Sequence, residues 1–210
     1  MTSQGNMDGF LIKLDCMGKL VWMEQLSGAG WDEIRCVTVD KDDNVIVGGS
    51  FGINGPQSAI GGFTITSVGN RDIFIAKIDK QGNFLWVNDY GGSSSDRPGG
   101  ITTDNIGDIY VTGSFSTTLN FGGQPWTSNG QMDLFICKLS SSGNELWFYD
   151  AGGTGYDYGN AIIIDEAKVY VCGNFSNTVD FGTGPLNSSG SYDIFFLSMD
   201  SATMGLGWVN

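Results

Sequence analysis

The chain has 210 residues, with 33 glycines, four prolines, no histidine and a formal net charge of −13. Because 23 acidic residues outnumber 10 basic ones, the mean electrostatic field repels phosphate backbones and anionic lipid, and we expect no nucleic-acid partner. The absence of histidine excludes Ser-His-Asp relays, Cys-His relays and every His-ligated metal site. Carboxylate chemistry is the catalytic class that stays open.

Membrane insertion and disulfide scaffolding are both unexpected. No apolar run approaches the ~18 residues that a membrane-spanning helix needs. The four cysteines lack metal-site or disulfide-framework spacing, and we predict free structural thiols, with a hidden bridge or a reactive thiol as the alternative. They are Cys16, Cys36, Cys137 and Cys172.

An internal repeat of about sixty residues organises the chain. Four seven-residue segments with alternating apolar residues begin at Asp8, Asp72, Asp133 and Asp193. Each is followed by a glycine-bearing turn and a tryptophan, which together predict a β-hairpin. We expect the four tryptophans to pack between neighbouring sheets; they are Trp22, Trp86, Trp147 and Trp208.

A second type of hairpin alternates with the first. Residues 36–51, 100–115 and 161–175 each contain two short β-branched runs around a polar turn. Each repeat therefore holds four short strands, joined by short turns and one longer loop, which is typical of a four-stranded antiparallel sheet.

Both faces of these strands are apolar. In the second repeat Phe74, Ala76 and Ile78 point to one face, and Ile73 and Ile75 point to the other. A sheet with two apolar faces must lie between two other layers, and here those layers are copies of the same repeat. Radial stacking of such sheets is a β-propeller, whereas a sandwich would have one polar face per strand.

We therefore predict one all-β domain over residues 1–210. Its repeats cover residues 2–65, 66–126 and 127–186, with a partial repeat at 187–210, and they form an open arc of three four-stranded antiparallel blades plus half a blade. Closed propellers have about four to eight blades. The expected partners thus include further propeller blades from the same or another chain; a fragment boundary without biological meaning is the alternative.

Several strings resemble a known repeat family. YVTGSFSTTLNFGG and TSNGQMDLFICKLSSSGNELW, followed by a Gly-Gly turn with Asp157, are similar to the SBBP-type β-propeller repeat of secreted and cell-surface bacterial proteins. The resemblance covers nearly the whole chain, although residues 52–71 form a longer connection. It implies a propeller fold, an extracellular or cell-surface location, and no established catalytic residue or cofactor. The first ten residues lack a signal-peptide pattern.

Three aspartates recur beside the connections between sheets. Asp32, Asp96 and Asp157 lie at equivalent positions in SGAGWDE, GGSSSDR and GGTGYDY. They could form a ring of carboxylates around a cation, or each could accept backbone N–H groups and stabilise its own turn. Recurrence in every unit is typical of an architectural role, so we predict structural turn carboxylates and no metal site.

Residues that differ between units are the better binding candidates. Polar-tipped aromatic side chains on loops can stack on sugars or anchor a protein partner, and ordinary loop packing is the alternative. The candidates are Trp31, Arg97, Trp126, Tyr156 and Tyr158.

These observations predict a non-catalytic scaffold or recognition module for a protein or polysaccharide, at the cell surface or outside the cell. The alternative is part of a carboxylate-based glycoside hydrolase or lyase, whose mechanism needs two acids that face each other. Glu33 is the non-repeated acid in the connection that such an enzyme would use.

Overall fold

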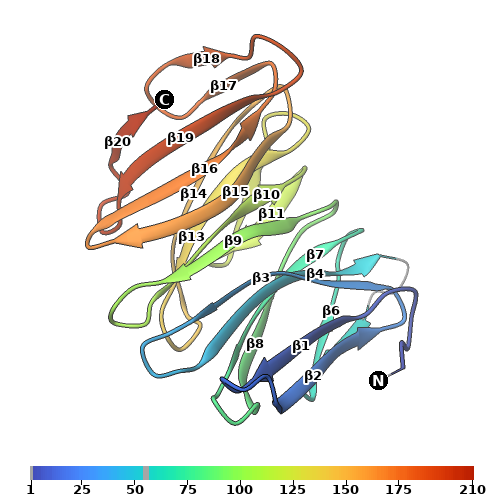
Figure 1. Ribbon diagram of the computed structural model, residues 1–210. Helices are drawn as coiled ribbons and strands as arrows, with labels where there is room; N and C mark the ends of the chain where they lie inside the picture. The colour runs from blue at the N-terminus through green and yellow to red at the C-terminus, as the bar shows by residue number, and fades with distance from the viewer. Residues whose placement is uncertain (1, 54–56) are drawn as a thin grey trace.

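The fold is built from stacked antiparallel β-sheets (Figure 1). The computed structural model describes residues 2–53 and 57–210, and within these ranges every regular helix or strand is a β-strand. The same residues contain no helix with the length and apolarity needed to span a bilayer. The predicted all-β class is confirmed, and the four-stranded antiparallel sheets fit a β-propeller-like fold.

Three sheets each combine an inner and an outer hairpin, and we number them 2 to 4 along the chain. Each takes its two hairpins from two successive sequence repeats, so neighbouring repeats share a sheet. Sheet 2 contains β3 (Trp31–Val39), β4 (Val45–Ile53), β7 (Asp72–Ile78) and β8 (Phe84–Tyr90). Sheet 3 contains β9 (Arg97–Thr103), β10 (Ile109–Phe115), β13 (Asp133–Leu139) and β14 (Glu145–Gly153). Sheet 4 contains β15 (Asp157–Asp165), β16 (Lys168–Phe175), β19 (Asp193–Asp200) and β20 (Leu206–Val209).

The expected longer loop of each repeat is in fact a third hairpin, which corrects the prediction of four strands per repeat. The sequence does carry a turn signal: Gly122 and Gly123 both have positive φ, 63° and 71°, as a tight hairpin turn requires. The strands were missed because they have only three or four residues. They are β5 (Gln57–Ile60) with β6 (Phe63–Thr66), β11 (Thr118–Phe121) with β12 (Gln124–Thr127), and β17 (Thr178–Asp180) with β18 (Pro185–Asn187).

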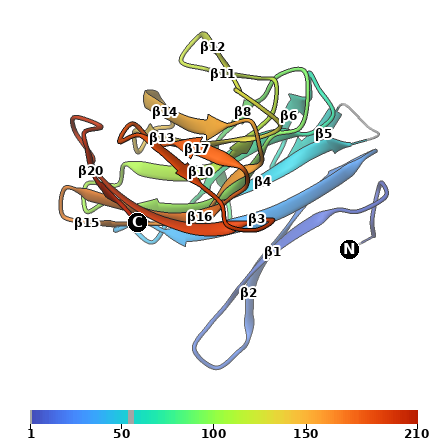
Figure 2. The same ribbon diagram turned by 90° about the horizontal axis from the view of Figure 1, so that it is seen from above.

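Each third hairpin reaches back to the outer edge of the preceding sheet. β5 pairs with β2 (Leu20–Gly28), so sheet 1 has the order β1-β2-β5-β6, with β1 spanning Gly9–Leu14. β17 pairs with β14 in the same way, and the Asn120 N–H of β11 donates to the Gly91 carbonyl beside β8 at 3.0 Å. Figure 2 shows the β11–β12 hairpin at one margin of the stack and the β1–β2 hairpin projecting at the other.

The hydrophobic core consists of layers between successive sheets. In β7, Phe74, Ala76 and Ile78 pack toward sheet 1, whereas Ile73 and Ile75 pack toward sheet 3. All five are buried, and full burial of a side chain as large as Phe or Ile contributes about 1.5–3 kcal/mol. The two apolar faces predicted for this strand are therefore confirmed.

Two of the four repeated tryptophans donate a hydrogen bond from one sheet to the next, in agreement with the prediction that they pack between sheets. The Trp22 indole N–H donates to the Lys80 carbonyl at 3.1 Å, and the Trp147 indole N–H donates to the Ser201 carbonyl at 3.1 Å. Both acceptors lie in the outer-hairpin turn of the following sheet. Trp22 and Trp147 thus each reach a backbone acceptor across an interface between two sheets. The buried Trp86 Nε1 has no hydrogen-bond partner among the described residues, and Trp208, on the last sheet, is 44% exposed.

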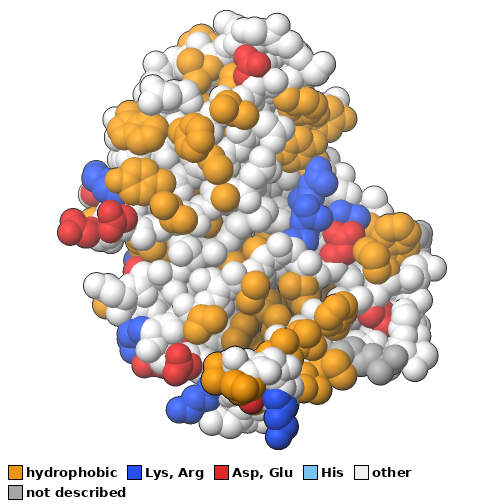
Figure 3. Space-filling view, viewed as in Figure 1, with side chains coloured by type: hydrophobic (Ala, Val, Ile, Leu, Met, Phe, Trp, Pro, Cys, Tyr) orange, Lys and Arg blue, Asp and Glu red, His pale blue; other side chains and the backbone are white. Residues whose placement is uncertain are grey.

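The outward faces of the two end sheets are uncovered. Ile194 and Phe196 of sheet 4 are 74% and 51% exposed, whereas their equivalents in sheet 3, Leu134 and Ile136, are fully buried. In sheet 1 the uncovered face is the opposite one, where Phe10 is 62% exposed. Hydrophobic side chains over sheet 4 are visible in Figure 3.

Candidate functional site

All three arginines of the chain gather where β3, β7 and β9 come together. Glu33 lies between two of them, with its Oε2 3.0 Å from Arg35 Nη1 and 3.8 Å from Arg71 Nη1. Burial lowers the pKa of Arg71; Glu33 opposes this, while Arg97 and Arg35 add to the lowering. Basic side chains gathered beside an acidic one are visible in Figure 3. The chain has 23 acidic and only 10 basic residues, so three arginines in one place form an unusual positive cluster.

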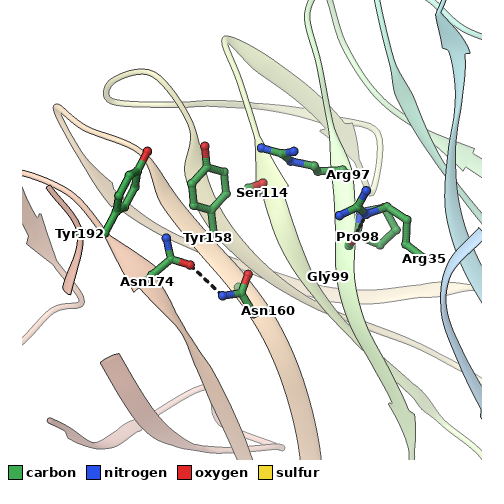
Figure 4. Close-up of a pocket in the computed structure, with 10 residues that line it drawn as sticks. Arg35, Arg97, Pro98, Gly99, Ser114, Tyr158, Asn160, Asn174 and Tyr192 are labelled. Atoms are coloured by element: carbon green, nitrogen blue, oxygen red, sulfur yellow. Dashed lines mark hydrogen bonds between the residues drawn. The ribbon is translucent and has the colours of Figure 1, made fainter. Parts of the chain in front are cut away.

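A cavity of about 350 Å³ lies next to two of these arginines, between β9 and β15 (Figure 4). The strands approach closely because glycines face each other: a Cβ on Gly99 would collide with the carbonyl oxygen of Gly159. We call this cavity the Arg–Tyr site. Its polar and charged lining side chains are Arg35, Arg97, Ser114, Tyr158, Asn160, Asn174 and Tyr192.

The two arginines of the Arg–Tyr site differ in how their charge is compensated. Arg35 donates from Nε to the Pro98 carbonyl at 3.1 Å and pairs with Glu33. Arg97 lies with its Cζ 5.0 Å from the centre of the Tyr158 ring, and its Nη2 is 3.5 Å from the Met132 sulfur. Within residues 2–53 and 57–210, no carboxylate lies within ion-pair distance of Arg97.

Three tyrosines form a row beside Arg97. The Tyr156 and Tyr158 rings stack with centres 6.2 Å apart and planes at 14°, and Tyr192 lies 6.2 Å beyond Tyr158. Figure 4 shows the hydroxyls of Tyr158 and Tyr192 at the same end of the cavity. Burial raises the pKa of Tyr158, although Arg97 opposes this. The phenol therefore stays protonated at neutral pH and can donate a hydrogen bond.

The structure brings together three of the five predicted binding residues. Arg97 and Tyr158 line the cavity, and Tyr156 stacks on Tyr158. Trp31 is 41% exposed at the equivalent place between sheets 1 and 2, where it bridges to Met7. Trp126 packs on Phe148 with ring centres 4.8 Å apart, in the core between sheets 2 and 3.

Five of the polar or charged lining residues were missed by the sequence reasoning. Tyr192 occupies the position before a repeated aspartate, where the other units have Met7, Arg71 and Met132. The comparison of differences between units would therefore have found it. The other four lie on strands and had no separate signal; they are Arg35, Ser114, Asn160 and Asn174.

The three turn aspartates are buried and accept hydrogen bonds, while their architectural role stays a prediction. Asp96 accepts from the Gly92 N–H and the Ser116 N–H, both at 3.1 Å. Asp157 accepts from the Gly153 N–H at 2.8 Å, and Asp32 accepts from the Ser58 hydroxyl at 2.6 Å.

Each turn aspartate also lies near a second repeated aspartate. The carboxylates of Asp72 and Asp133 add to the raised pKa values of Asp96 and Asp157, respectively, although burial is the larger cause. The pKa of Asp96 rises to about 8 and that of Asp157 to about 6. In the described part of the chain, no three His, Cys, Asp or Glu side chains form a group that could hold a metal ion.

Glu33, the acid considered for catalysis, borders a neighbouring cavity of about 480 Å³ together with Asp8 and Asp32. It is engaged by two arginines. The described lining of the Arg–Tyr site includes no acidic side chain.

The four cysteines are all free in the structure. Burial raises the pKa of the Cys36 thiol to about 12 and also raises the pKa of Cys137. Both thiols are therefore protonated at neutral pH and poor nucleophiles.

No protein-family model matches the chain. Over 142 residues, or 65% of its length, it is 27% identical to an uncharacterized WD repeat-containing protein of Acanthamoeba polyphaga mimivirus, and the match covers 10% of that protein. The chain thus spans about a tenth of the curated relative that it matches. A crystal structure of a protein of unknown function from Bacteroides caccae is 11% identical, with a TM-score of 0.41, over 94% of this chain and 73% of that one.

The SBBP-type resemblance stays a prediction, since no family model supports it. The similarity to a WD repeat-containing protein and the stack of antiparallel sheets both indicate a β-propeller-like repeat, but they do not identify the repeat family. The all-β fold of stacked antiparallel sheets fits a β-propeller-like repeat.

Proposed function

We propose that the chain is a non-catalytic recognition module that holds a protein partner at the Arg–Tyr site. The observation that carries this proposal is the gathering of all three arginines beside a row of tyrosines, with Arg97 lacking a carboxylate partner in the described residues. Arg and Tyr are among the residues that contribute most energy at the centres of protein interfaces.

A protein partner is favoured over a polysaccharide because the ring of the central tyrosine, Tyr158, already has three neighbours. Sugar recognition by aromatic residues uses an open ring face, but the Tyr158 ring contacts Arg97, Tyr156 and Tyr192. The polar tips of these side chains remain for the ligand, which favours hydrogen bonding and charge over stacking. Polysaccharide binding is the competing outcome.

The enzyme alternative has less support. A glycoside hydrolase needs two acids on opposite sides of the bond that it cleaves, and Glu33 is instead held by Arg35 and Arg71. The location at the cell surface or outside the cell rests on the sequence resemblance. In this proposal the sheets form an open arc of three blades and a partial one, with uncovered end faces for further blades.

A selection of random peptides displayed on phage tests the proposal. Enriched peptides should bind the chain and lose about tenfold or more in affinity when Tyr192→Ala truncates the site. Phe63→Ala, which removes an aromatic of similar exposure from β6 in sheet 1, is the matched control and should leave binding unchanged. Selection of no peptide, or equal binding to both variants, would contradict a protein-recognition role.

A further inference from the structure

The Arg–Tyr site is rich in hydrogen-bond donors and poor in free acceptors. Arg97 supplies guanidinium N–H groups, and Tyr158 and Tyr192 supply hydroxyls at the same end of the cavity. Asn160 donates to Asn174 Oδ1 at 2.7 Å, so the Asn174 amide nitrogen still has its donors available. A site of this composition fits an anionic group better than a neutral one.

The charge balance points in the same direction. An arginine is always protonated, and a half-buried guanidinium is normally compensated by a carboxylate. Glu33 pairs with both Arg35 and Arg71, one negative charge beside two positive ones. The chain has 23 acidic residues, and in the described ranges none of them reaches Arg97 within ion-pair distance. The missing counter-charge is therefore expected from a ligand.

We infer that the Arg–Tyr site binds an acidic segment of the protein partner, with one carboxylate of that segment accepting hydrogen bonds from Arg97 and from the hydroxyls of Tyr158 and Tyr192. This inference rests on the proposed function and deepens it. The planar fork of the guanidinium matches the two oxygens of a carboxylate. The Tyr158 ring lies 5.0 Å from the Arg97 Cζ and so limits the orientations of that fork.

A peptide partner fits these contacts better than an acidic sugar does. A uronate would present a carboxylate together with a ring that needs an open aromatic face, and Tyr158 has neighbours on its ring. An aspartate or glutamate side chain presents the carboxylate on a narrow stem. The cavity of about 350 Å³ has room for such a side chain and the backbone next to it.

The test compares a synthetic Gly-Gly-Glu-Glu-Gly-Gly peptide with its Gln-Gln counterpart by isothermal titration calorimetry on the full chain. The glutamate peptide should bind at least about tenfold more tightly, because a charge-assisted hydrogen bond is stronger than a neutral one. Arg97→Gln should remove this preference. Arg97→Lys, which keeps the charge but loses the fork, should retain part of it.

Lys168→Gln is the matched control, since it removes one positive charge from the exposed end of β16 near Asp200. It should leave the preference for glutamate intact. Equal thermal melting of Arg97→Gln and the wild-type chain separates loss of binding from loss of folding. Equal affinity for the two peptides, or an unchanged preference in Arg97→Gln, would overturn the inference.

Two further outcomes separate this inference from the proposed function. If digalacturonate binds more tightly than the glutamate peptide and depends on Arg97, the ligand is an acidic sugar and the peptide assignment is wrong. If phage-selected peptides depend on Tyr192 but are not enriched in Asp or Glu, the recognition role stands and the carboxylate assignment fails.

Discussion

At the scale of single residues, four buried aspartates have pKa values well above that of a free aspartate. Asp96 and Asp157 are fully buried, and in the described ranges neither meets a lysine or arginine within ion-pair distance. Their pKa values are about 8 and about 6, mainly because of burial. Asp72 and Asp133, the neighbouring repeated aspartates, also have pKa values of about 6 for the same main reason.

These shifts predict that the chain is more stable at pH 5 than at pH 8. An aspartate has a pKa of about 3.8 in the unfolded chain. Where its pKa in the folded chain is higher, the folded chain binds more protons than the unfolded chain at every pH between the two pKa values. The stabilisation is therefore complete below about pH 4 and is lost as the pH rises through about 6 and then 8. We expect the free energy of unfolding in urea to fall by about 2 kcal/mol or more between pH 5 and pH 8.

Asp40 does not cancel this trend, because its pKa is lowered and it titrates outside this pH range. Despite desolvation, hydrogen bonds from Asn44 and Lys77 lower the pKa of Asp40 to about 2, so its stabilisation is present above 3.8 and lost only in stronger acid. Asp157→Asn keeps an acceptor for the Gly153 N–H and removes the charge, and it should add about 1 kcal/mol at pH 8. Asp79→Asn, in an exposed turn, should not stabilise. A flat or rising stability from pH 5 to pH 8 would show that the buried carboxylates are compensated.

At the scale of secondary-structure elements, the third hairpins tie neighbouring sheets together. The Phe121 ring on β11 lies 5.3 Å from Tyr90 of sheet 2 and 5.2 Å from Phe148 of sheet 3. On the next such hairpin, the Phe181 ring lies 4.7 Å from Phe195, and its carbonyl accepts from the Tyr149 hydroxyl at 2.8 Å. Each hairpin thus covers the outer end of an interface between sheets.

This arrangement predicts a large loss of stability for a single substitution in a very short strand. Phe121→Ala should lower the free energy of unfolding by about 3 kcal/mol, because it opens a cavity among packed aromatic rings. Gln124→Ala, at an exposed position of the same hairpin, should change it by less than about 0.5 kcal/mol. Urea unfolding followed by tryptophan fluorescence measures both. A loss below about 1 kcal/mol for Phe121→Ala would mean that the hairpin is peripheral to the core.

At the scale of the whole molecule, the two uncovered end faces are complementary. The exposed face of sheet 4, with Ile194 and Phe196, corresponds to the face that sheet 3 packs against its successor. The exposed face of sheet 1, with Phe10, corresponds to the face that sheet 2 packs against its predecessor through Phe74. The outer hairpin of sheet 4 of one copy can therefore meet the outer hairpin of sheet 1 of a second copy as outer hairpins meet within the stack.

We therefore expect concentration-dependent, head-to-tail self-association of the 210-residue chain, measured by sedimentation velocity. Phe196→Glu should shift the distribution to the monomer, because it places a charge on an apolar interface. Val68→Glu, at an exposed apolar position away from both end faces, should leave the association unchanged. A wild-type chain that stays monomeric at all concentrations would contradict the prediction.

The sequence alone determined the local pattern. Period-two alternation, glycine turns and β-branched runs identify the hairpins, since these signals depend on neighbouring residues only. The two-sided apolar pattern of residues such as Ile73 and Phe74 also required stacked sheets, because each face needs a covering layer. Two of the hydrogen bonds of the turn aspartates are local in the same sense: Asp157 and Asp96 each accept from an N–H group four residues earlier in the chain.

Only the tertiary structure decided what meets across the sheets. The pairing of β5 with the preceding sheet, the proximity of Asp133 to Asp157, and the gathering of Arg35, Arg71 and Arg97 join elements that are distant in the chain. No local pattern encodes these contacts, because they follow from the stacking of the sheets and from the close approach that glycines permit between β9 and β15. The candidate site arises at this level.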